Sequence, residues 1–204
     1  MKIFVTGIGT EIGKTISSAI LVEALEADYW KPIQAGELKF SDTDKVKTLI
    51  SNENSQFHPE GYRLKAAMSP HAAAKKEGVE IKIDNCHEPH TENTLIIEGA
   101  GGLAVPLNDT DCIIDLIAHL KAETILISQH YLGSINHTLL SVEALEKRGL
   151  PIKGIIFNGD ENKATEDIIL SKTGLDFLGR IPNMNTIDKD SIQSMAQHFK
   201  HLKS

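Results

Sequence analysis

The sequence of 204 residues has little cysteine and lacks long hydrophobic runs. Its two cysteines, Cys86 and Cys112, lie in unlike contexts, which argues against a disulfide framework. No stretch approaches the roughly 18 consecutive apolar residues that a membrane span needs. The chain runs from Met1 straight into an expected strand, without the pattern of a signal peptide. We therefore expect a cytoplasmic protein with no membrane partner.

Positive charge is also in short supply, because 21 lysine and arginine residues stand against 28 aspartate and glutamate residues, a formal net charge of −7. A general nucleic-acid binder needs a basic surface to neutralise phosphates, so we do not expect nucleic acid as a partner. A nucleotide site needs only local positive charge, and salt screens a distant acidic surface beyond about 8 Å. The charge balance therefore leaves nucleotide binding open.

The sequence has no internal repeat and no low-complexity linker, so we expect one domain over residues 1–204. Apolar β-rich runs alternate with segments of helical periodicity. This order predicts right-handed βαβ crossovers and an α/β fold, in which helices cover both faces of a mostly parallel sheet. The expected strands are residues 2–6, 28–31, 94–98, 124–128, 153–157 and 177–181, and the expected helices are residues 14–26, 111–120, 135–148, 162–172 and 188–202.

Residues 36–93 interrupt this alternation. Two stretches within them, residues 42–50 and 69–77, have a helical pattern and are joined by polar loops. Insertions in open α/β sheets follow the carboxyl ends of strands, where ligands bind. The region is therefore either a variable surface excursion or a helical part of the substrate site.

The strongest motif is the stretch Gly7–Thr15, with the sequence GIGTEIGKT, which follows the first strand and opens the first helix. In this context a glycine-rich loop binds phosphates. Gly13 lets the backbone approach them, Lys14 reaches the β- and γ-phosphates, and the Thr15 hydroxyl binds Mg²⁺. Five residues separate Gly7 from Gly13, one more than usual. The motif predicts binding of ATP or GTP on a three-layer, P-loop NTPase-like fold.

Acidic and basic residues follow the neighbouring strands. Glu98 ends a buried apolar strand and precedes four small residues, so its charge could face the loop and be neutralised by Mg²⁺. Lys31 ends another strand and either points into the same cleft or is solvated. Asp42 and Asp44 precede an expected helix, which either could cap. As a Mg²⁺ ligand, Asp44 would complete an oxygen-rich shell.

Together these segments resemble the dethiobiotin synthetase family, whose phosphate loop has the same stretched form. The resemblance spans nearly the whole chain. The segments Glu98–Gly102 and Gly133–His137 are far more specific together than either is alone. The matching stretches are Gly7–Thr15, Lys31-Pro32, Ser69-Pro70-His71, Glu98-Gly99-Ala100-Gly101-Gly102, Gly133-Ser134-Ile135-Asn136-His137, Asn158 and Ile181-Pro182.

The resemblance implies a role for each matching position. Lys31 and Lys14 would be catalytic, with Lys31 contacting a carbamate and the transferring phosphoryl group. Mg²⁺ would be held by Thr15, Asp44 and Glu98. The substrate would meet Ala35, Gly133, Ser134, Ile135 and Asn136. ATP would be bound by Gly9, Thr10, Glu11, Ile12, Gly13, Lys14, Thr15, Asp44, Glu98, Gly99, Ala100, Gly101, Asn158, Ile181 and Pro182.

The implied reaction joins 7,8-diaminopelargonate and CO₂ (or bicarbonate) at the expense of ATP. A carbamate would attack the γ-phosphate to give a carbamic–phosphoric anhydride, and the second amine would close the ring. The family's substrate carboxylate site crosses a homodimer interface, so we expect a homodimer. Ala35 departs from the family's usual Ser or Thr, which limits it to backbone contact unless Gln34 or a water substitutes.

Two other classes of protein are weighed against a ligase. A partitioning or septum-site type of nucleotide switch is compatible with the apolar spacing of residues 192–202, which suits a membrane-surface helix or one packed on the sheet. Those switches carry a lysine at the start of their phosphate loop, where this chain has Thr6-Gly7-Ile8. A glutamine-dependent amidoligase needs a further glutaminase domain with a Cys nucleophile, for which these 204 residues leave no room.

The residues Cys86-His87-x-x-His90 also suggest a zinc site, but a fourth ligand is missing from this polar segment.

Overall fold

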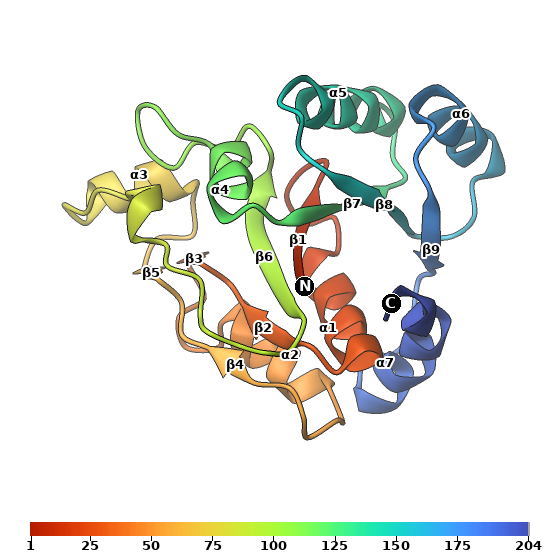
Figure 1. Cartoon of the computed structure of the whole chain (residues 1–204), viewed down its shortest axis with the longest axis horizontal. Coiled ribbons are helices and arrows are strands. Elements are labelled where there is room, and N and C mark those ends of the chain that lie inside the picture. The colour runs from red at the N-terminus through yellow and green to blue at the C-terminus, as the bar shows by residue number, and fades with distance from the viewer. Residues whose placement is uncertain (204) are drawn as a thin grey trace.

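The computed structural model describes residues 1–203, and its centre is one sheet of seven parallel strands (Figure 1). The strand order is β4-β2-β6-β1-β7-β8-β9. The strand β1, which leads into the phosphate loop, lies between β6 and β7. Their bounds are Lys2–Gly7 (β1), Asp28–Trp30 (β2), Phe57–His58 (β4), Leu95–Gly102 (β6), Glu123–Gln129 (β7), Ile152–Asn158 (β8) and Phe177–Ile181 (β9).

Helices cover both faces of this sheet, as doubly wound parallel sheets require. One face packs against α1 (Lys14–Leu25), α2 (Asp42–Leu49), α7 (Lys189–Ala196) and the 3₁₀ helix η2 (Gln197–Leu202). The opposite face packs against α3 (Pro70–Lys76), α4 (Ile113–Leu120), α5 (Ser134–Lys147) and α6 (Lys163–Thr173). Alternate residues of β1 enter the two cores, Ile3 and Val5 on the α1 face and Phe4 on the other. The predicted three-layer α/β fold is confirmed.

The elements expected from periodicity all form, and most of their ends shift by at most two residues. The exceptions are β6, which runs four residues beyond the expected end at Glu98, and the last helix, which continues as a 3₁₀ helix after Ala196. The sequence pattern missed the shortest ones, namely β3 (Ile33–Ala35), β4, β5 (Tyr62–Leu64) and the 3₁₀ helix η1 (Ile83–Asn85). Runs of two or three residues are too short to show a period of two. The strands β3 and β5 pair in parallel as a small second sheet. The region 36–93 therefore contributes β5 to this sheet and β4 to the main sheet, besides the helices α2 and α3.

The chain ends in a helix that packs on the α1 face. Ile192, Ala196, Phe199 and Leu202 are buried in the same core as α1, and the helix changes from α to 3₁₀ at Gln197. The apolar stripe of this segment is therefore covered by the protein's own core, as the packed-helix interpretation predicts. No helix within residues 1–203 is both long and apolar enough to cross a membrane.

Candidate active site

The phosphate loop connects β1 to α1 in a tight turn. Gly13 has a φ of 88°, in the left-handed region that favours glycine. A Cβ atom at Gly13 would lie 2.3 Å from Nδ2 of Asn158, so a larger residue would displace that side chain as well as strain the backbone. The Lys14 ammonium donates a hydrogen bond to the Gly9 carbonyl, 2.8 Å away. The Lys14 side chain therefore folds back onto the backbone of the stretched loop.

Lys14 is unusual because it is a lysine with only 7% of its surface exposed. Burial lowers its pKa to about 8, and the positive charge of Lys31 acts in the same direction, while Glu98 and Asp42 oppose the shift. A buried ammonium with one backbone partner is short of acceptors, since it can donate three hydrogen bonds. An anionic ligand in the loop would meet that need.

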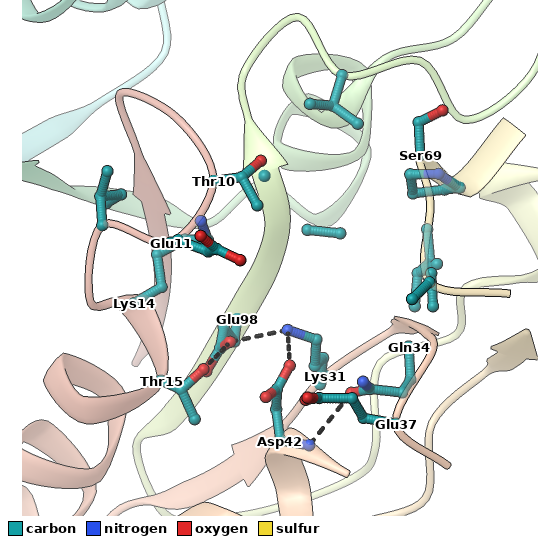
Figure 2. A pocket seen from close by; sticks show the side chains of 18 of the residues that line it. Thr10, Glu11, Lys14, Thr15, Lys31, Gln34, Glu37, Asp42, Ser69 and Glu98 are labelled. Carbon is teal, nitrogen blue, oxygen red and sulfur yellow. Dashed lines mark hydrogen bonds and ion pairs between the residues drawn. The ribbon is translucent and has the colours of Figure 1, made fainter. Parts of the chain in front are cut away.

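Glu98 lies at the centre of a cluster of polar side chains that also includes Thr15, Lys31 and Asp42 (Figure 2). It is 1% exposed, and its Oε1 atom accepts from the Thr15 hydroxyl at 2.9 Å and from the Lys31 ammonium at 2.8 Å. Strand register explains the meeting, because Val5 pairs with Glu98 and Trp30 with Ile97, so Lys31 follows beside Glu98. Parallel strands thus deliver the acid and the lysine to the same edge of the sheet, where α1 supplies Thr15.

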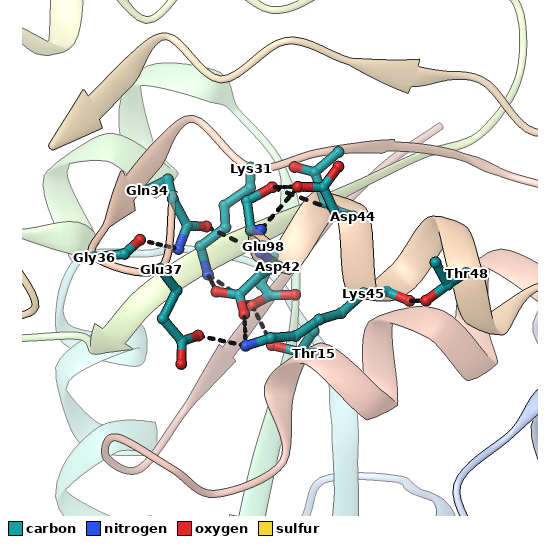
Figure 3. A network of polar contacts seen from close by, with 12 residues as sticks. Thr15, Lys31, Gln34, Gly36, Glu37, Asp42, Asp44, Lys45, Thr48 and Glu98 are labelled. Carbon is teal, nitrogen blue, oxygen red and sulfur yellow. Dashed lines mark hydrogen bonds and ion pairs between the residues drawn. The ribbon is translucent and has the colours of Figure 1, made fainter. Parts of the chain in front are cut away.

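Asp42, in the first turn of α2, completes the cluster from the other side (Figure 3). Its Oδ2 atom is 2.8 Å from the Lys31 ammonium, and its Oδ1 atom is 3.0 Å from that of Lys45. Burial would raise the pKa of Asp42, but the two lysines outweigh it and the pKa is lowered. Burial would likewise lower the pKa of Lys31, yet Glu98 and Asp42 raise it. Lys31 is therefore a buried cation between two carboxylates.

Asp44 does not join this cluster, in contrast to the expectation from the sequence. Its carboxylate accepts from the backbone N–H of Ser41 at 2.8 Å and from the Ser41 hydroxyl at 2.9 Å, which closes a capping box on α2. Residues two apart on a helix point in directions about 200° apart, so Asp42 and Asp44 cannot both face the cavity. The acid that the helix turns toward Lys31 is Asp42.

The cluster lines a cavity of about 670 Å³. In Figure 2 the loop residues Thr10 and Glu11 lie on one side, Ser69 and Gln34 on the other, and Glu98 and Lys31 between them. The Gln34 amide donates to the Gly36 carbonyl at 3.0 Å and accepts from the Asp42 N–H at 3.3 Å, so it is already engaged beside Ala35. The predicted site residues that line the cavity are Thr10, Glu11, Ile12, Gly13, Lys14, Thr15, Lys31, Ala35, Glu98, Ala100 and Gly101.

Other predicted nucleotide contacts lie outside this cavity lining. Asn158 ends β8 and donates from Nδ2 to the Ile12 carbonyl at 3.0 Å, so it contacts the loop from the side opposite Lys31. Ile181 pairs with Asn158 in the sheet and has a buried side chain, and Pro182 follows it. Gly9 meets the cluster through its bond from Lys14. Gly99 leaves no room for a side chain, because a Cβ would lie 2.7 Å from the Phe4 ring.

The segment Gly133–Asn136 starts α5, and among residues 1–203 the cavity lining includes none of it. Gly133 has a φ of 103° at the N-cap position, and the first N–H groups of the helix follow it. Exposed apolar side chains surround this turn, with Leu132 fully exposed and Tyr131, Ile135 and Leu140 partly so. The structure therefore leaves the predicted carboxylate site outside the lining of this cavity.

Two residues of the cluster were missed from the sequence. Tyr29 donates its hydroxyl to Glu98 Oε2 at 2.9 Å, and Lys45 bonds both Asp42 and Glu37. A signal for Lys45 was available, since it lies three residues after Asp42, on the same helical face. Tyr29 looked like an ordinary apolar strand residue, although it lies two residues before Lys31 and hence on the same face of β2.

The cysteine considered for a zinc site belongs to the apolar core. Cys86 is buried with the residues under α3 and α4, and burial raises the pKa of its thiol to about 11. A thiol of this kind is a poor thiolate donor at neutral pH.

Comparison with known proteins finds relatives over nearly the whole chain. A family model described as an AAA domain matches residues 1–191. The chain is 52% identical to an ATP-dependent dethiobiotin synthetase BioD of Christiangramia forsetii, over 97% of this chain and 95% of that protein. It is also 52% identical to the protein of the same description from Cytophaga hutchinsonii, over 96% of this chain and 95% of that protein.

Solved structures with the same fold are far more distant in sequence. The cell division ATPase MinD of Pyrococcus furiosus has a TM-score of 0.58 at 14% identity, covering 98% of this chain and 99% of that one. A putative plasmid partition protein of Borrelia burgdorferi B31 bound to AMPPNP has a TM-score of 0.57 at 14% identity, with 98% of both chains covered. Identities this low bear on the fold alone, whereas the full-length relatives bear on the family. The chain belongs to the ATP-dependent dethiobiotin synthetase family.

Proposed function

We propose that this chain carries out the reaction of its family, the ATP-dependent synthesis of dethiobiotin in biotin biosynthesis. The substrates would be 7,8-diaminopelargonate, CO₂ and ATP, and the products dethiobiotin, ADP and phosphate. One observation carries the proposal beyond family membership: Lys31 lies between Glu98 and Asp42 in a cavity that also contains the phosphate loop. Phosphoryl transfer depends chiefly on positioning and charge neutralisation, which this arrangement can provide.

The triphosphate would bind along Thr10–Thr15, where backbone N–H groups and the start of α1 favour anions. The Lys14 ammonium would exchange the Gly9 carbonyl for phosphate oxygens. Asn158 lies against Ile12 at the far end of the loop, which suits contact with the adenine beside Ile181 and Pro182. Nucleotide selection would therefore occur on the β8–β9 side, away from Lys31.

The residues present fit a magnesium ion. Thr15 Oγ1 and Glu98 Oε1 are 2.9 Å apart, and the Lys31 ammonium contacts both Glu98 and Asp42. The oxygens of Thr15, Glu98 and Asp42 therefore face one small region, where a cation would be favoured. Hydroxyl and carboxylate oxygens are what this hard cation prefers. We therefore propose Thr15, Glu98 and Asp42 as its ligands, with Asp42 in the role first expected of Asp44. When bound, the ion would neutralise charge on the β- and γ-phosphates.

Lys31 would act on the reacting groups. The carbamate formed from the diamine and CO₂ is an anion, and the phosphoryl group that it attacks is also negative, so the two repel unless a cation lies between them. The pKa of Lys31 is raised, so this side chain is a permanent ammonium at neutral pH. Its charge would hold the carbamate oxygen near the γ-phosphate. The second amine would then close the ring and expel phosphate, with no covalent protein intermediate.

The far end of the substrate would need a second copy of the chain. At the helix start Gly133–Asn136 the Ser134 N–H already bonds the Tyr131 carbonyl, and the N–H groups of Ile135 and Asn136 are left for a carboxylate. This turn lies outside the cavity lined by its own phosphate loop. In a homodimer, this turn from one protomer would complete the cavity of the other. Exposed Leu132, Ile135 and Leu140 beside it offer the apolar surface for such an interface.

An assay of ADP release tests the function. Purified protein with ATP and Mg²⁺ should release ADP only when 7,8-diaminopelargonate is added, and removing bicarbonate and dissolved CO₂ should slow the release. Dethiobiotin identified by mass spectrometry would complete the result. ADP release at the same rate with and without the diamine, together with ATP-dependent co-sedimentation with liposomes, would instead favour a nucleotide switch. The burial of Phe199 and Leu202 in the core argues against that alternative.

A further inference from the structure

Tyr29 is a fully buried tyrosine whose polar end is directed at the candidate metal site. Its exposure is 0%, and its hydroxyl donates to Glu98 Oε2 at 2.9 Å. The ring lies in the core of the α1 face and contacts the Phe57 ring at a centroid distance of 6.0 Å. A buried apolar position at this point of β2 would be filled equally well by phenylalanine, so the hydroxyl calls for a separate explanation.

The hydrogen bonds divide the two oxygens of Glu98 between two tasks. Oε1 faces Thr15 and Lys31, at 2.9 and 2.8 Å, on the cavity side. Oε2 faces the core and has the Tyr29 hydroxyl at 2.9 Å. The last torsion of a glutamate side chain is broad, so hydrogen bonds to its two oxygens decide how the carboxylate is turned. With Oε2 fixed from below, Oε1 is kept in the cavity.

Strand register makes this arrangement a consequence of the fold. Tyr29 pairs with Ile96 across β2 and β6, and both side chains lie in the α1-face core. Two residues further along, Lys31 and Glu98 lie on the same face. Tyr29 is therefore one step deeper than Lys31 on β2, at the right height for its long side chain to reach the underside of the Glu98 carboxylate.

We propose that Tyr29 is a positioning residue, which orients Glu98 for the divalent cation through the bond to Oε2. The proposal rests on the metal role assigned to Glu98 under the proposed function. Partners that hold a metal-ligating side chain from behind typically change metal affinity by about 10- to 100-fold when they are removed. Tyr29 would act on the metal site without touching the nucleotide or the diamine.

Tyr29→Phe removes the hydroxyl and keeps the ring. We expect the Mg²⁺ concentration for half-maximal activity to rise about tenfold, with kcat largely restored at saturating Mg²⁺. Tyr62→Phe is the matched control, because its hydroxyl bonds only the backbone of Lys82, at 2.9 and 3.3 Å, outside the cavity. Equal Mg²⁺ requirements in Y29F and Y62F would overturn the proposal.

A binding measurement separates this proposal from the proposed function. Mn²⁺ binding in the presence of ADP, followed by electron paramagnetic resonance, needs no turnover. Y29F should weaken Mn²⁺ binding about tenfold in the wild-type background and have no further effect in Glu98→Gln. An equal effect in both backgrounds would overturn the positioning role, because Tyr29 would then act independently of Glu98. Wild-type protein that binds Mn²⁺·ADP but makes no dethiobiotin would contradict only the proposed function.

Should Y29F not fold, Tyr29→Leu provides a second route, because it also removes the hydroxyl and keeps an apolar side chain in the core. Glu98 and its bonds to Thr15 and Lys31 stay intact in this variant. Mn²⁺ binding should then weaken about tenfold. Unchanged Mn²⁺ affinity in Y29L would overturn the proposal, since the bond to Glu98 Oε2 would be lost without consequence.

Discussion

At the scale of single residues, the site depends on a lysine that is almost fully buried and yet charged. Lys31 keeps its charge because Glu98 and Asp42 each lie 2.8 Å from its ammonium group. Removing such a cation leaves two carboxylates facing each other in a shielded place. The same side chain is therefore important both for the chemistry and for the local structure.

Lys31→Ala should lower kcat by about 100- to 1000-fold, the usual cost of losing one preorganised charge in a transition state. The fold should survive, because the sheet and both cores are unchanged, and circular dichroism would check this. Lys47→Ala is the control, since Lys47 is an exposed lysine on α2. Turnover within a factor of a few of wild type in K31A would refute the catalytic role.

Asp42→Asn and Asp44→Asn form a pair that separates metal binding from helix capping. D42N should raise the Mg²⁺ requirement about tenfold or more, because Asp42 faces the cavity. D44N should leave the Mg²⁺ requirement unchanged and lower the free energy of unfolding by about 0.5–2 kcal/mol, because it weakens the capping box with Ser41. Mg²⁺ titrations and urea unfolding measure the two effects. The reverse pattern would restore Asp44 as the ligand.

Sequence reasoning identified most of the cluster, and its choice of Asp44 as a Mg²⁺ ligand stays a prediction, whereas the structure places Asp42 beside Lys31 and Asp44 in a capping box. Thr15, Lys31 and Glu98 were recognised because each follows a strand or opens a helix at a fixed edge of the sheet. The choice between Asp42 and Asp44 depends on helix phase. The spacing Ser41-x-x-Asp44 is that of a capping box, which already favours Ser41 as the N-cap and Asp44 as its N3 partner.

At the scale of elements, the short strand β2 leads directly into Lys31 and must be held in place. Its first residue, Asp28, is buried and accepts hydrogen bonds from the Gln56 N–H at 2.9 Å, the Thr91 hydroxyl at 2.6 Å and the Asn93 amide at 3.0 Å. His58 Nε2 lies 3.2 Å away. Asp28 thus joins β2 to the segments that precede β4 and β6.

The pKa of Asp28 predicts how this junction responds to acid. Burial would raise the pKa, but the hydrogen bonds from Asn93, Thr91 and Gln56 outweigh it and lower the pKa below its ordinary value of 3.8. A carboxylate with a lowered pKa stabilises the fold above the unfolded value, and this contribution is lost as the pH falls through the folded value. Its stabilisation is therefore full at neutral pH and fades below 3.8.

Asp28→Asn should lower the free energy of unfolding by about 1–3 kcal/mol near pH 7, and the gap from wild type should shrink near pH 3. Urea unfolding at the two pH values measures it. Asp84→Asn is the control, because the Asp84 side chain is 90% exposed. A gap of the same size at both pH values would contradict the assigned role of the charge.

At the scale of the whole molecule, the alternation of strands and helices was enough to predict a three-layer α/β fold. The pairing of β3 with β5 could not be predicted, because each strand has three residues and their partners are almost thirty residues apart. The position of the Gly133–Asn136 turn relative to the cavity was also out of reach. That position depends on how α5 packs against the sheet, and the order of apolar and polar residues along the sequence does not determine it.

The position of that turn outside the cavity lining of its own chain leads to the prediction for the assembly. Leu140 is 53% exposed on α5, one turn beyond Asn136. In the proposed homodimer, Leu140→Glu would bury an unpaired carboxylate in an apolar interface, which costs several kcal/mol. We expect the dimer dissociation constant to rise by at least about tenfold, measured by light scattering over a dilution series.

The loss of activity in L140E should come from weaker binding of the diamine and not from weaker binding of ATP. The KM for 7,8-diaminopelargonate should rise at protein concentrations where the dimer dissociates, because the carboxylate loses the partner's helix start. ATP affinity should stay near wild type, since the phosphate loop, Lys31, Asp42 and Glu98 all belong to one chain. Ile168→Glu on α6 is the matched control, because Ile168 is 39% exposed and lies on another helix. A fully monomeric L140E with an unchanged KM for the diamine would mean that one chain binds the whole substrate.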